Sequence, residues 1–280
     1  MNYFLLLLLV FSLTSSHAQT NIDKQKKEIL AEGMRLYRSE MASWYGTDLF
    51  LPRYENKENI GGYLSYTENE NATCIFFSKK PNPQVLGTIT FNQNYELEQA
   101  LIDITTRDFT KKELDLYTLR QVALEDIAQD TLYKRYRNTQ LNLVPLIHGK
   151  EKKVYVLTGP SISGVVIFGN DYLITFNKDN TIRSKKQLHK NIIPINTNET
   201  ENGHLVLSTI HSHLPETGHL PTATDICTLL LYSPFTTWES HLIISDKYRS
   251  IWDCKKSDLL VLSNEVIDKI NQHQDAKDKD

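Results

Sequence analysis

Cysteine is scarce in this chain, whose 280 residues include only Cys74, Cys227 and Cys254. The odd number and the lack of any C-x-x-C pair exclude a disulfide-stapled scaffold, thiol redox chemistry and a cysteine-based zinc site. At most one bridge can form within the chain, and Cys227 with Cys254 is the first pair to test. The alternative is that all three are buried small hydrophobic side chains.

An excess of charge of one sign is also lacking. The 31 Lys and Arg residues and the 34 Asp and Glu residues leave a formal net charge of −3. Such a balance provides no basic field, so we expect neither nucleic acid nor an anionic membrane surface as a partner. Apolar residues make up 40% of the chain, which is enough for a hydrophobic core in a protein of this length.

Long hydrophobic runs are absent apart from residues 4–13. This run of about 10 residues is half of the roughly 20 needed to cross a bilayer, so we expect no membrane span. Ser16 and Ala18 follow the run and precede Gln19, a small-residue pattern typical of a secretory signal peptide. The sequence therefore predicts a signal peptide at residues 1–18, cleaved near Ala18, and a secreted or periplasmic protein.

Residues 19–150 carry alternating helix and strand patterns. Apolar residues spaced by three and four predict a helix over 23–44, with a stripe formed by Leu30, Met34, Tyr37, Met41 and Trp44. Thr110 and Glu113 form a capping box that opens a second helix, to about residue 136. Three β-rich runs lie between the helices, at 60–66, 73–78 and 86–91, and the first two form a hairpin. We expect an α+β N-terminal region here, and no chemical signature indicates its role.

Residues 151–265 contain short strands separated by Gly, Asn and Asp turns. The expected strands are 154–157, 164–168, 172–176, 192–195, 205–210, 241–245 and 248–252. One helix starts near residue 224 and a closing helix runs to about residue 272, within a charged C-terminal tail, 266–280. The whole pattern predicts the α+β class, with a mixed β-sheet flanked by helices.

The most informative segment begins at the end of the strand 205–210. His211 and His213 are one residue apart, and residues i and i+2 of an extended strand point to the same face. Asp225 lies twelve residues after His213, at the start of a helix that Thr222 or Thr224 can cap. Two imidazoles and one carboxylate, with water in the fourth position, form a typical catalytic zinc site. We therefore expect His211, His213 and Asp225 to bind Zn²⁺.

This arrangement over about residues 150–262 resembles the JAB1/MPN (JAMM) metalloprotease family, and most of all its RadC-type and JAB-type branches. The resemblance implies a JAMM-like fold and a zinc hydrolase that cleaves a peptide or isopeptide bond. His211 and His213 match the family's ligand pair and Asp225 matches its acidic ligand. Thr222 stands at the family's serine and would help to orient the developing oxyanion as a catalytic residue.

Two features depart from the family pattern. The segment from His213 to Asp225 is one residue longer, which a loop absorbs at little cost. The family's upstream glutamate, which activates the metal-bound water, has no counterpart between Leu157 and Gly164. Glu151 and Glu216 are the only nearby carboxylates that could replace this base.

Three hypotheses about function follow. The first is a secreted zinc hydrolase acting on a peptide or protein, and the second is a catalytically inactive JAMM-like relative that binds a partner at the cell envelope, which the missing glutamate favours. In the third, the protein is a structural or accessory secreted protein and the histidine segment is coincidental. His219 could be a substitute ligand or an ordinary loop residue, whereas we expect His204 and His241 to be partly buried polar residues without a catalytic role.

Overall fold

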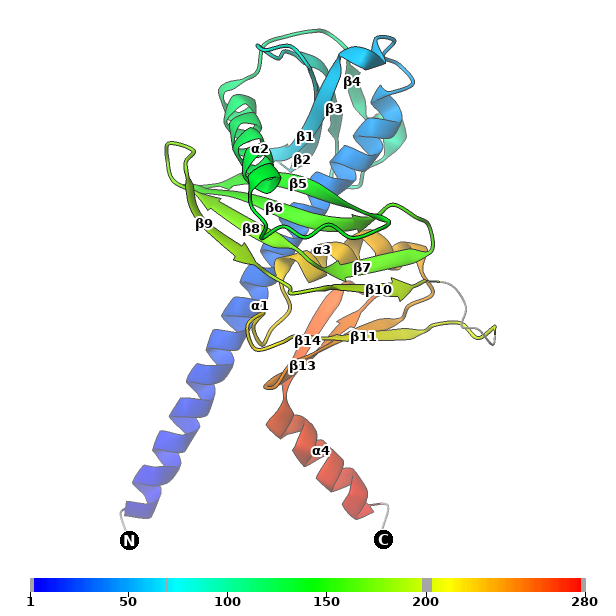
Figure 1. Cartoon of the computed structure of the whole chain (residues 1–280). Coiled ribbons are helices and arrows are strands. Elements are labelled where there is room, and N and C mark those ends of the chain that lie inside the picture. Colours follow the sequence, from blue (N-terminus) through cyan, green and yellow to red (C-terminus); the bar gives the residue numbers. More distant parts are fainter. Residues whose placement is uncertain (1–2, 69, 198–202, 278–280) are drawn as a thin grey trace.

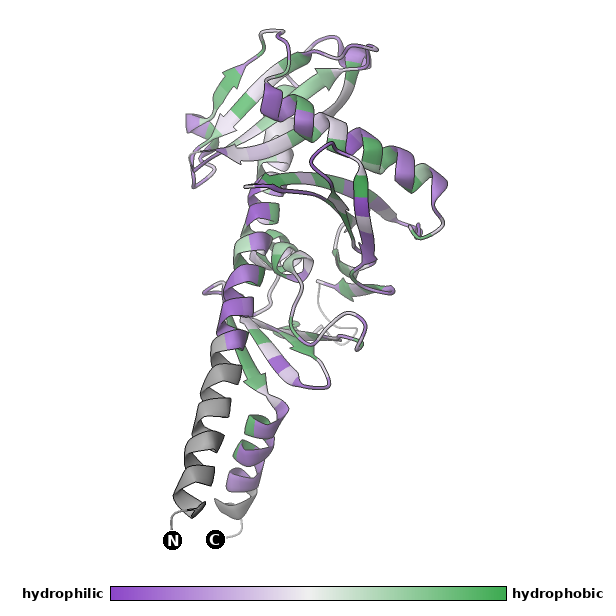
Figure 2. Cartoon of the chain, turned by 90° about the vertical axis from the view of Figure 1, so that its left-hand side faces the viewer, coloured by the Kyte–Doolittle hydropathy of each residue, from purple (hydrophilic) through white to green (hydrophobic). Residues whose placement is uncertain are grey.

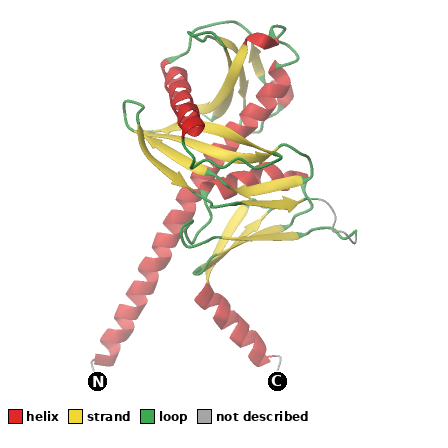
Figure 3. Ribbon diagram, viewed as in Figure 1, coloured by secondary structure: helices red, strands yellow, loops and turns green. Residues whose placement is uncertain are grey.

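Helix α1 (Tyr3–Phe50) runs through most of the length of the protein and contacts both its N-terminal and C-terminal parts (Figure 1). A computed structural model describes the backbone of residues 3–68, 70–197 and 203–277 and, within these ranges, the side chains from 21 to 274. In this part of the chain, several antiparallel sheets are flanked by four α-helices (Figure 3). The predicted α+β class is confirmed.

The signal peptide is predicted at residues 1–18, whose side chains are not among those that the structure describes. Among the helices that are described, none combines the length and apolar character that a bilayer crossing requires. The C-terminal helix α4 (Asn264–Lys277) extends away from the sheets at the lower end of the molecule (Figures 1 and 2).

The apolar stripe predicted for α1 is only partly buried. Met34 is 42% exposed, whereas Leu36 and Ala42 are fully buried. The helix packs against the N-terminal strands and also against α3 (Ala223–Tyr232), so its buried surface is wider than a single stripe. A Cβ at Gly33 would lie 2.6 Å from the Cβ of Ile226, so a glycine is needed where α1 crosses α3.

The N-terminal sheet has the order β1-β2-β3-β4, and all its pairings are antiparallel. Its strands are β1 (Ile60–Glu68), β2 (Asn71–Ser78), β3 (Val85–Phe91) and β4 (Leu101–Asp103). The predicted β1–β2 hairpin and the strand β3 are confirmed, and the short strand β4 was not predicted. Phe50 at the end of α1 stacks on Phe76 of β2, with ring centroids 4.0 Å apart.

A second antiparallel sheet has the order β5-β6-β8-β9 and carries α2 (Lys111–Gln129). Its strands are β5 (Thr139–His148), β6 (Glu151–Pro160), β8 (Tyr172–Phe176) and β9 (Ile182–Gln187). The Thr110–Glu113 capping box is present, but α2 ends at Gln129, earlier than predicted, because Asp130 is extended. Residue 150, the expected domain boundary, lies in the turn between the paired strands β5 and β6, so one hairpin joins the two regions.

The C-terminal part combines a two-stranded and a four-stranded sheet. The two-stranded sheet pairs β7 (Val165–Gly169) with β10 (Ile192–Asn196), and the four-stranded sheet contains β11 (Ser208–Ser212), β12 (Ser240–Ile244), β13 (Tyr248–Asp253) and β14 (Asp258–Ser263). Strands β11 and β12 are parallel and are connected through α3, which makes this a β-α-β unit. Three single-turn 3₁₀ helices complete the described chain, at Lys57–Asn59, Leu97–Gln99 and Ser233–Phe235.

All three cysteines are free thiols. The pair Cys227–Cys254 that was considered for a disulfide is therefore not bonded. Cys74 and Cys227 are fully buried in the core that α1 and α3 share, as expected if they are small hydrophobic side chains, whereas Cys254 is partly buried. Burial raises the pKa of the Cys227 thiol well above its ordinary value.

Candidate metal centre

The β-α-β unit brings the predicted ligands together. His211 lies in β11 at an inward-facing position, and His213 continues the strand, since its backbone N–H donates to the carbonyl of Ile244. Asp225 occupies the first turn of α3, which starts directly after the histidine loop. His211, His213 and Asp225 are 5%, 6% and 1% exposed. The two imidazoles therefore face the carboxylate inside the protein.

A third imidazole joins this group from a different segment. His189 lies in the connection between β9 and β10 and is 6% exposed. Its Nε2 is 3.4 Å from Asp225 Oδ1 and 3.3 Å from His213 Nε2. His189, His213 and Asp225 thus form a buried cluster with their ligand atoms within 4.8 Å of one another, a cluster that could hold a metal ion.

His211 lies outside this group of three but next to it, and offers one further nitrogen. Its Nε2 is 3.6 Å from Asp225 Oδ1, and His213 Nε2 is 3.1 Å from Asp225 Oδ2. Within the described side chains, His211 Nε2 and Asp225 Oδ1 are buried atoms without a hydrogen-bond partner. Burying polar atoms without partners is costly, and a cation between them would remove that cost. Three imidazole nitrogens and one carboxylate oxygen suit a divalent transition metal such as zinc.

The far nitrogen of each imidazole faces a polar group. His213 Nδ1 is 3.1 Å from the carbonyl oxygen of Leu220, so Nδ1 carries the proton and Nε2 is left as a donor to a metal. His189 Nδ1 is 3.5 Å from Asp171 Oδ2 and has no hydrogen-bond partner among the described residues. His211 Nδ1 is 2.8 Å from His241 Nε2. All three Nε2 atoms therefore point toward the carboxylate.

Asp225 is fixed by the cap of its own helix. Its Oδ2 accepts hydrogen bonds from the backbone N–H of Thr222, at 2.7 Å, and from the Thr222 hydroxyl, at 2.8 Å. The same hydroxyl accepts the backbone N–H of Asp225, which completes a capping box. The hydroxyl of Thr222, the predicted catalytic residue, is thus hydrogen-bonded to the carboxylate of Asp225.

The charges in the cluster are strongly coupled. Burial opposes ionisation of Asp225, but His189 and His213 outweigh it and hold the pKa of the carboxyl well below its ordinary value. Burial would lower the pKa of His189, yet the charges of Asp225 and Asp171 raise it to about 10. For His211, burial dominates and lowers the pKa to about 4. A divalent ion would supply the positive charge that His189 provides as an imidazolium, and would release its proton.

The two carboxylates considered as replacements for the missing base are paired with lysine side chains at the surface. Glu151 lies 2.7 Å from Lys153 with its side chain 64% exposed, and Glu216 lies 3.8 Å from Lys190 with its side chain 59% exposed. His219, the possible substitute ligand, pairs with Asp246 at 2.6 Å. Sequence reasoning missed His189, which follows a strand of mainly polar residues and belongs to no motif.

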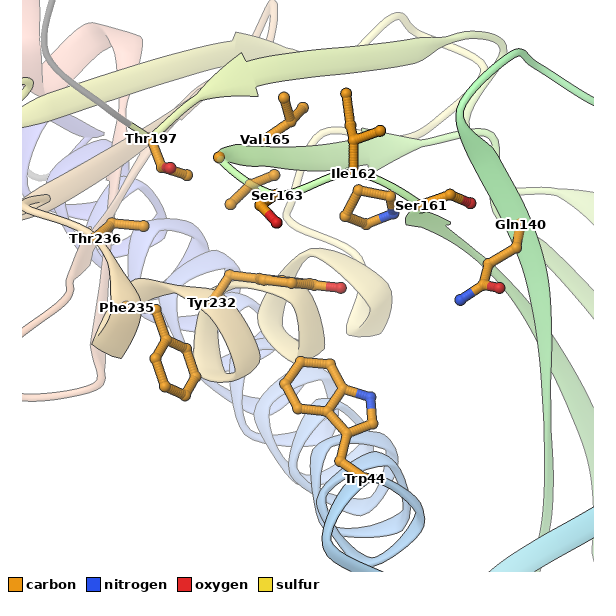
Figure 4. Close-up of a pocket in the computed structure, with 13 residues that line it drawn as sticks. Trp44, Gln140, Ser161, Ile162, Ser163, Val165, Thr197, Tyr232, Phe235 and Thr236 are labelled. Carbon is orange, nitrogen blue, oxygen red and sulfur yellow. The ribbon is translucent and has the colours of Figure 1, made fainter. Parts of the chain in front are cut away.

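Two cavities of about 660 Å³ lie near this part of the molecule. One borders Leu188 and Thr222, neighbours of the cluster, and its other walls include Glu32, Arg35 and Lys153. The other is lined only by uncharged residues, among them the aromatic side chains of Trp44, Tyr232 and Phe235 (Figure 4). Tyr232 and Phe235 lie at the end of α3 opposite to Asp225, so this second cavity is separate from the cluster.

Comparisons with known proteins identify no relative. No protein-family model matches the chain, and no match is found among curated proteins or among solved structures. The buried cluster of histidines and Asp225 is therefore the feature from which we infer a function.

Proposed function

We propose that this protein is an exported zinc-binding protein with a JAMM-like C-terminal region, in which His189, His211, His213 and Asp225 hold the ion. The observation that carries the proposal is the convergence of four buried donors, two of which have no other partner. The predicted signal peptide supports export, and the strand–His-x-His–helix arrangement supports the JAMM-like assignment.

Non-hydrolytic binding at the cell envelope fits these residues best. Structural zinc sites have four protein ligands, whereas catalytic sites keep one position for water. Here His189 offers a fourth ligand where a hydrolase would hold water. A hydrolase also needs a base within hydrogen-bond reach of that water, and the nearby glutamates Glu151 and Glu216 are paired with lysines at the surface. We therefore propose an accessory or partner-binding role in which zinc ties three segments together.

Peptide or isopeptide hydrolysis is the second candidate function. It is favoured by the cavity that borders Leu188 and Thr222, because a substrate held there would lie next to the cluster. In this case His211, His213 and Asp225 would be the three ligands, and His189 would remain outside the coordination shell.

Elemental analysis of the mature protein, purified without a polyhistidine tag, tests zinc binding. We expect about one zinc ion per chain, and His213→Ala should lose it because no other described donor replaces this ring in the cluster. His219→Ala is the matched control, since this histidine pairs with Asp246 and should leave the zinc content unchanged. A wild-type protein without zinc at micromolar metal would refute the proposal.

The same preparations separate the two candidate functions. The zinc-loaded protein is incubated with a peptide library and with isopeptide-linked substrates, and products are followed by mass spectrometry. We expect no cleavage. Cleavage that His213→Ala abolishes would instead establish the hydrolase.

A further inference from the structure

A second buried imidazole lies directly behind the proposed ligand His211. The Nε2 of His241 is 2.8 Å from Nδ1 of His211, and Nδ1 of His241 is 2.7 Å from the hydroxyl oxygen of Thr209. His241 is fully buried and Thr209 is 7% exposed. These contacts form an unbroken chain from the metal cluster to a hydroxyl group in the same sheet.

The pairing of β11 with β12 builds this chain. Thr209 and His211 are two residues apart and share the inner face of β11, and the parallel register places His241 opposite Thr209. The ring of Phe168 stacks on His241, with centroids 4.6 Å apart and planes inclined by 13°. The ring of Trp238 lies 5.9 Å from that of His241. His241 is therefore held in one orientation by its aromatic neighbours.

Each neutral imidazole carries a single N–H, so the chain can be ordered in only two ways. In the first, Nδ1–H of His211 donates to His241, and Nδ1–H of His241 donates to Thr209. In the second, the proton lies on Nε2 of both rings and the Thr209 hydroxyl donates to His241. Only the first order leaves Nε2 of His211 free to bind a metal.

We propose that His241 and Thr209 are positioning residues which select the metal-binding tautomer of His211. This inference rests on zinc binding at the cluster and assigns a role to two residues outside it. In the zinc-bound protein each ring then carries its proton on Nδ1, and the Thr209 hydroxyl accepts the hydrogen bond from His241 Nδ1. Metal affinity is thereby linked to a hydroxyl group two residues along the strand.

Thr209 allows a test with small changes in volume. Thr209→Val keeps the shape but removes the acceptor, so the metal-binding order would leave the buried N–H of His241 unpaired. Since such outer partners typically contribute 10–100-fold to metal affinity, we expect Thr209→Val to weaken zinc binding about 10-fold or more. Thr209→Ser retains the hydroxyl and should bind zinc within about 2-fold of wild type. Affinities are measured by competition with a chromophoric chelator on the mature chain.

Long-range ¹H–¹⁵N spectra of wild-type protein provide a measurement that requires no variant. With zinc bound, we expect the proton of both His211 and His241 on Nδ1. A folded Thr209→Val protein with wild-type affinity, or a zinc-loaded protein with the His241 proton on Nε2, would overturn the tautomer relay and leave zinc binding intact. A wild-type protein that binds no zinc would remove both proposals.

Discussion

Raising the pH should destabilise the metal-free protein through one side chain of the cluster, His189. The charges of Asp225 and Asp171 raise its folded-state pKa to about 10, above its ordinary value of 6.5. Between these values the folded state holds one proton more than the unfolded state. Its contribution to stability is therefore complete below pH 6.5 and is lost as the pH rises toward 10. One proton corresponds to about 1.4 kcal/mol per pH unit, or about 2 kcal/mol between pH 7 and 8.5.

Urea denaturation of the mature protein in the presence of a chelator, at half-unit steps from pH 7 to 8.5, measures this loss. Glu40, whose pKa burial raises to about 7, still loses part of its own contribution at the start of this window, so the steps above pH 7.5 report mainly on His189. His189→Gln is the control and should flatten the profile. Saturating zinc should flatten it too, because the metal removes the proton from the ring in the folded state.

A metal-free protein with a flat profile in this window would refute the charge coupling proposed for His189, Asp171 and Asp225. A slope that persists unchanged at saturating zinc would show that His189 keeps its proton when the metal is bound. The ion would then have at most three protein ligands, and the hydrolase candidate would gain support.

Two further predictions concern the helices that hold Asp225. Gly33→Ala should lower the free energy of unfolding by about 1–3 kcal/mol, because the new Cβ would overlap the Cβ of Ile226 on α3. Urea denaturation measures this loss, and an unchanged midpoint would contradict the close packing of α1 on α3. Thr222→Val should lower the free energy of unfolding by about 1 kcal/mol because it removes the helix cap, and it should weaken zinc binding because it releases Asp225 Oδ2. Thr222→Ser keeps the hydroxyl and should preserve both the stability and the zinc affinity. Wild-type zinc affinity in Thr222→Val would mean that the cap does not position the carboxylate.

Local patterns in the sequence predicted much of the fold. The capping box at Thr110, the N-cap expected at Thr222 or Thr224, the β1–β2 hairpin and most strands of the C-terminal region depend on residues within a few positions of one another. The strands β4, β5, β9 and β14 were missed. In β9 the side chains are mostly polar and exposed, so it has no alternating apolar pattern, and its place in a sheet depends on pairing with β8.

In the candidate site, too, residues with a local sequence signal could be predicted and residues placed by distant contacts could not. His211, His213 and Asp225 could be proposed from the sequence because strand alternation and a helix cap are local signals. His189 reaches the cluster from a connection 22 residues before His211, and its partner Asp171 is set by the turn between β7 and β8. His241 was expected to be a polar residue without a special role, and only the parallel pairing of β11 and β12 places it behind His211.

The support around His189 bears directly on the choice between zinc binding and hydrolysis. Asp171, 4% exposed, lies behind the ring, and its own Oδ1 accepts the backbone N–H of Thr158 at 2.9 Å. The carboxylate of Asp171 is 3.5 Å from His189 Nδ1, a nitrogen without a hydrogen-bond partner among the described residues, whereas the far nitrogens of His211 and His213 lie within 3.1 Å of a polar atom. Asp171 therefore holds His189 near Asp225 by charge rather than by a hydrogen bond. Its negative charge favours a cation at the cluster, and His189 Nε2, 3.4 Å from Asp225 Oδ1, is close enough to serve as the fourth ligand of a closed site.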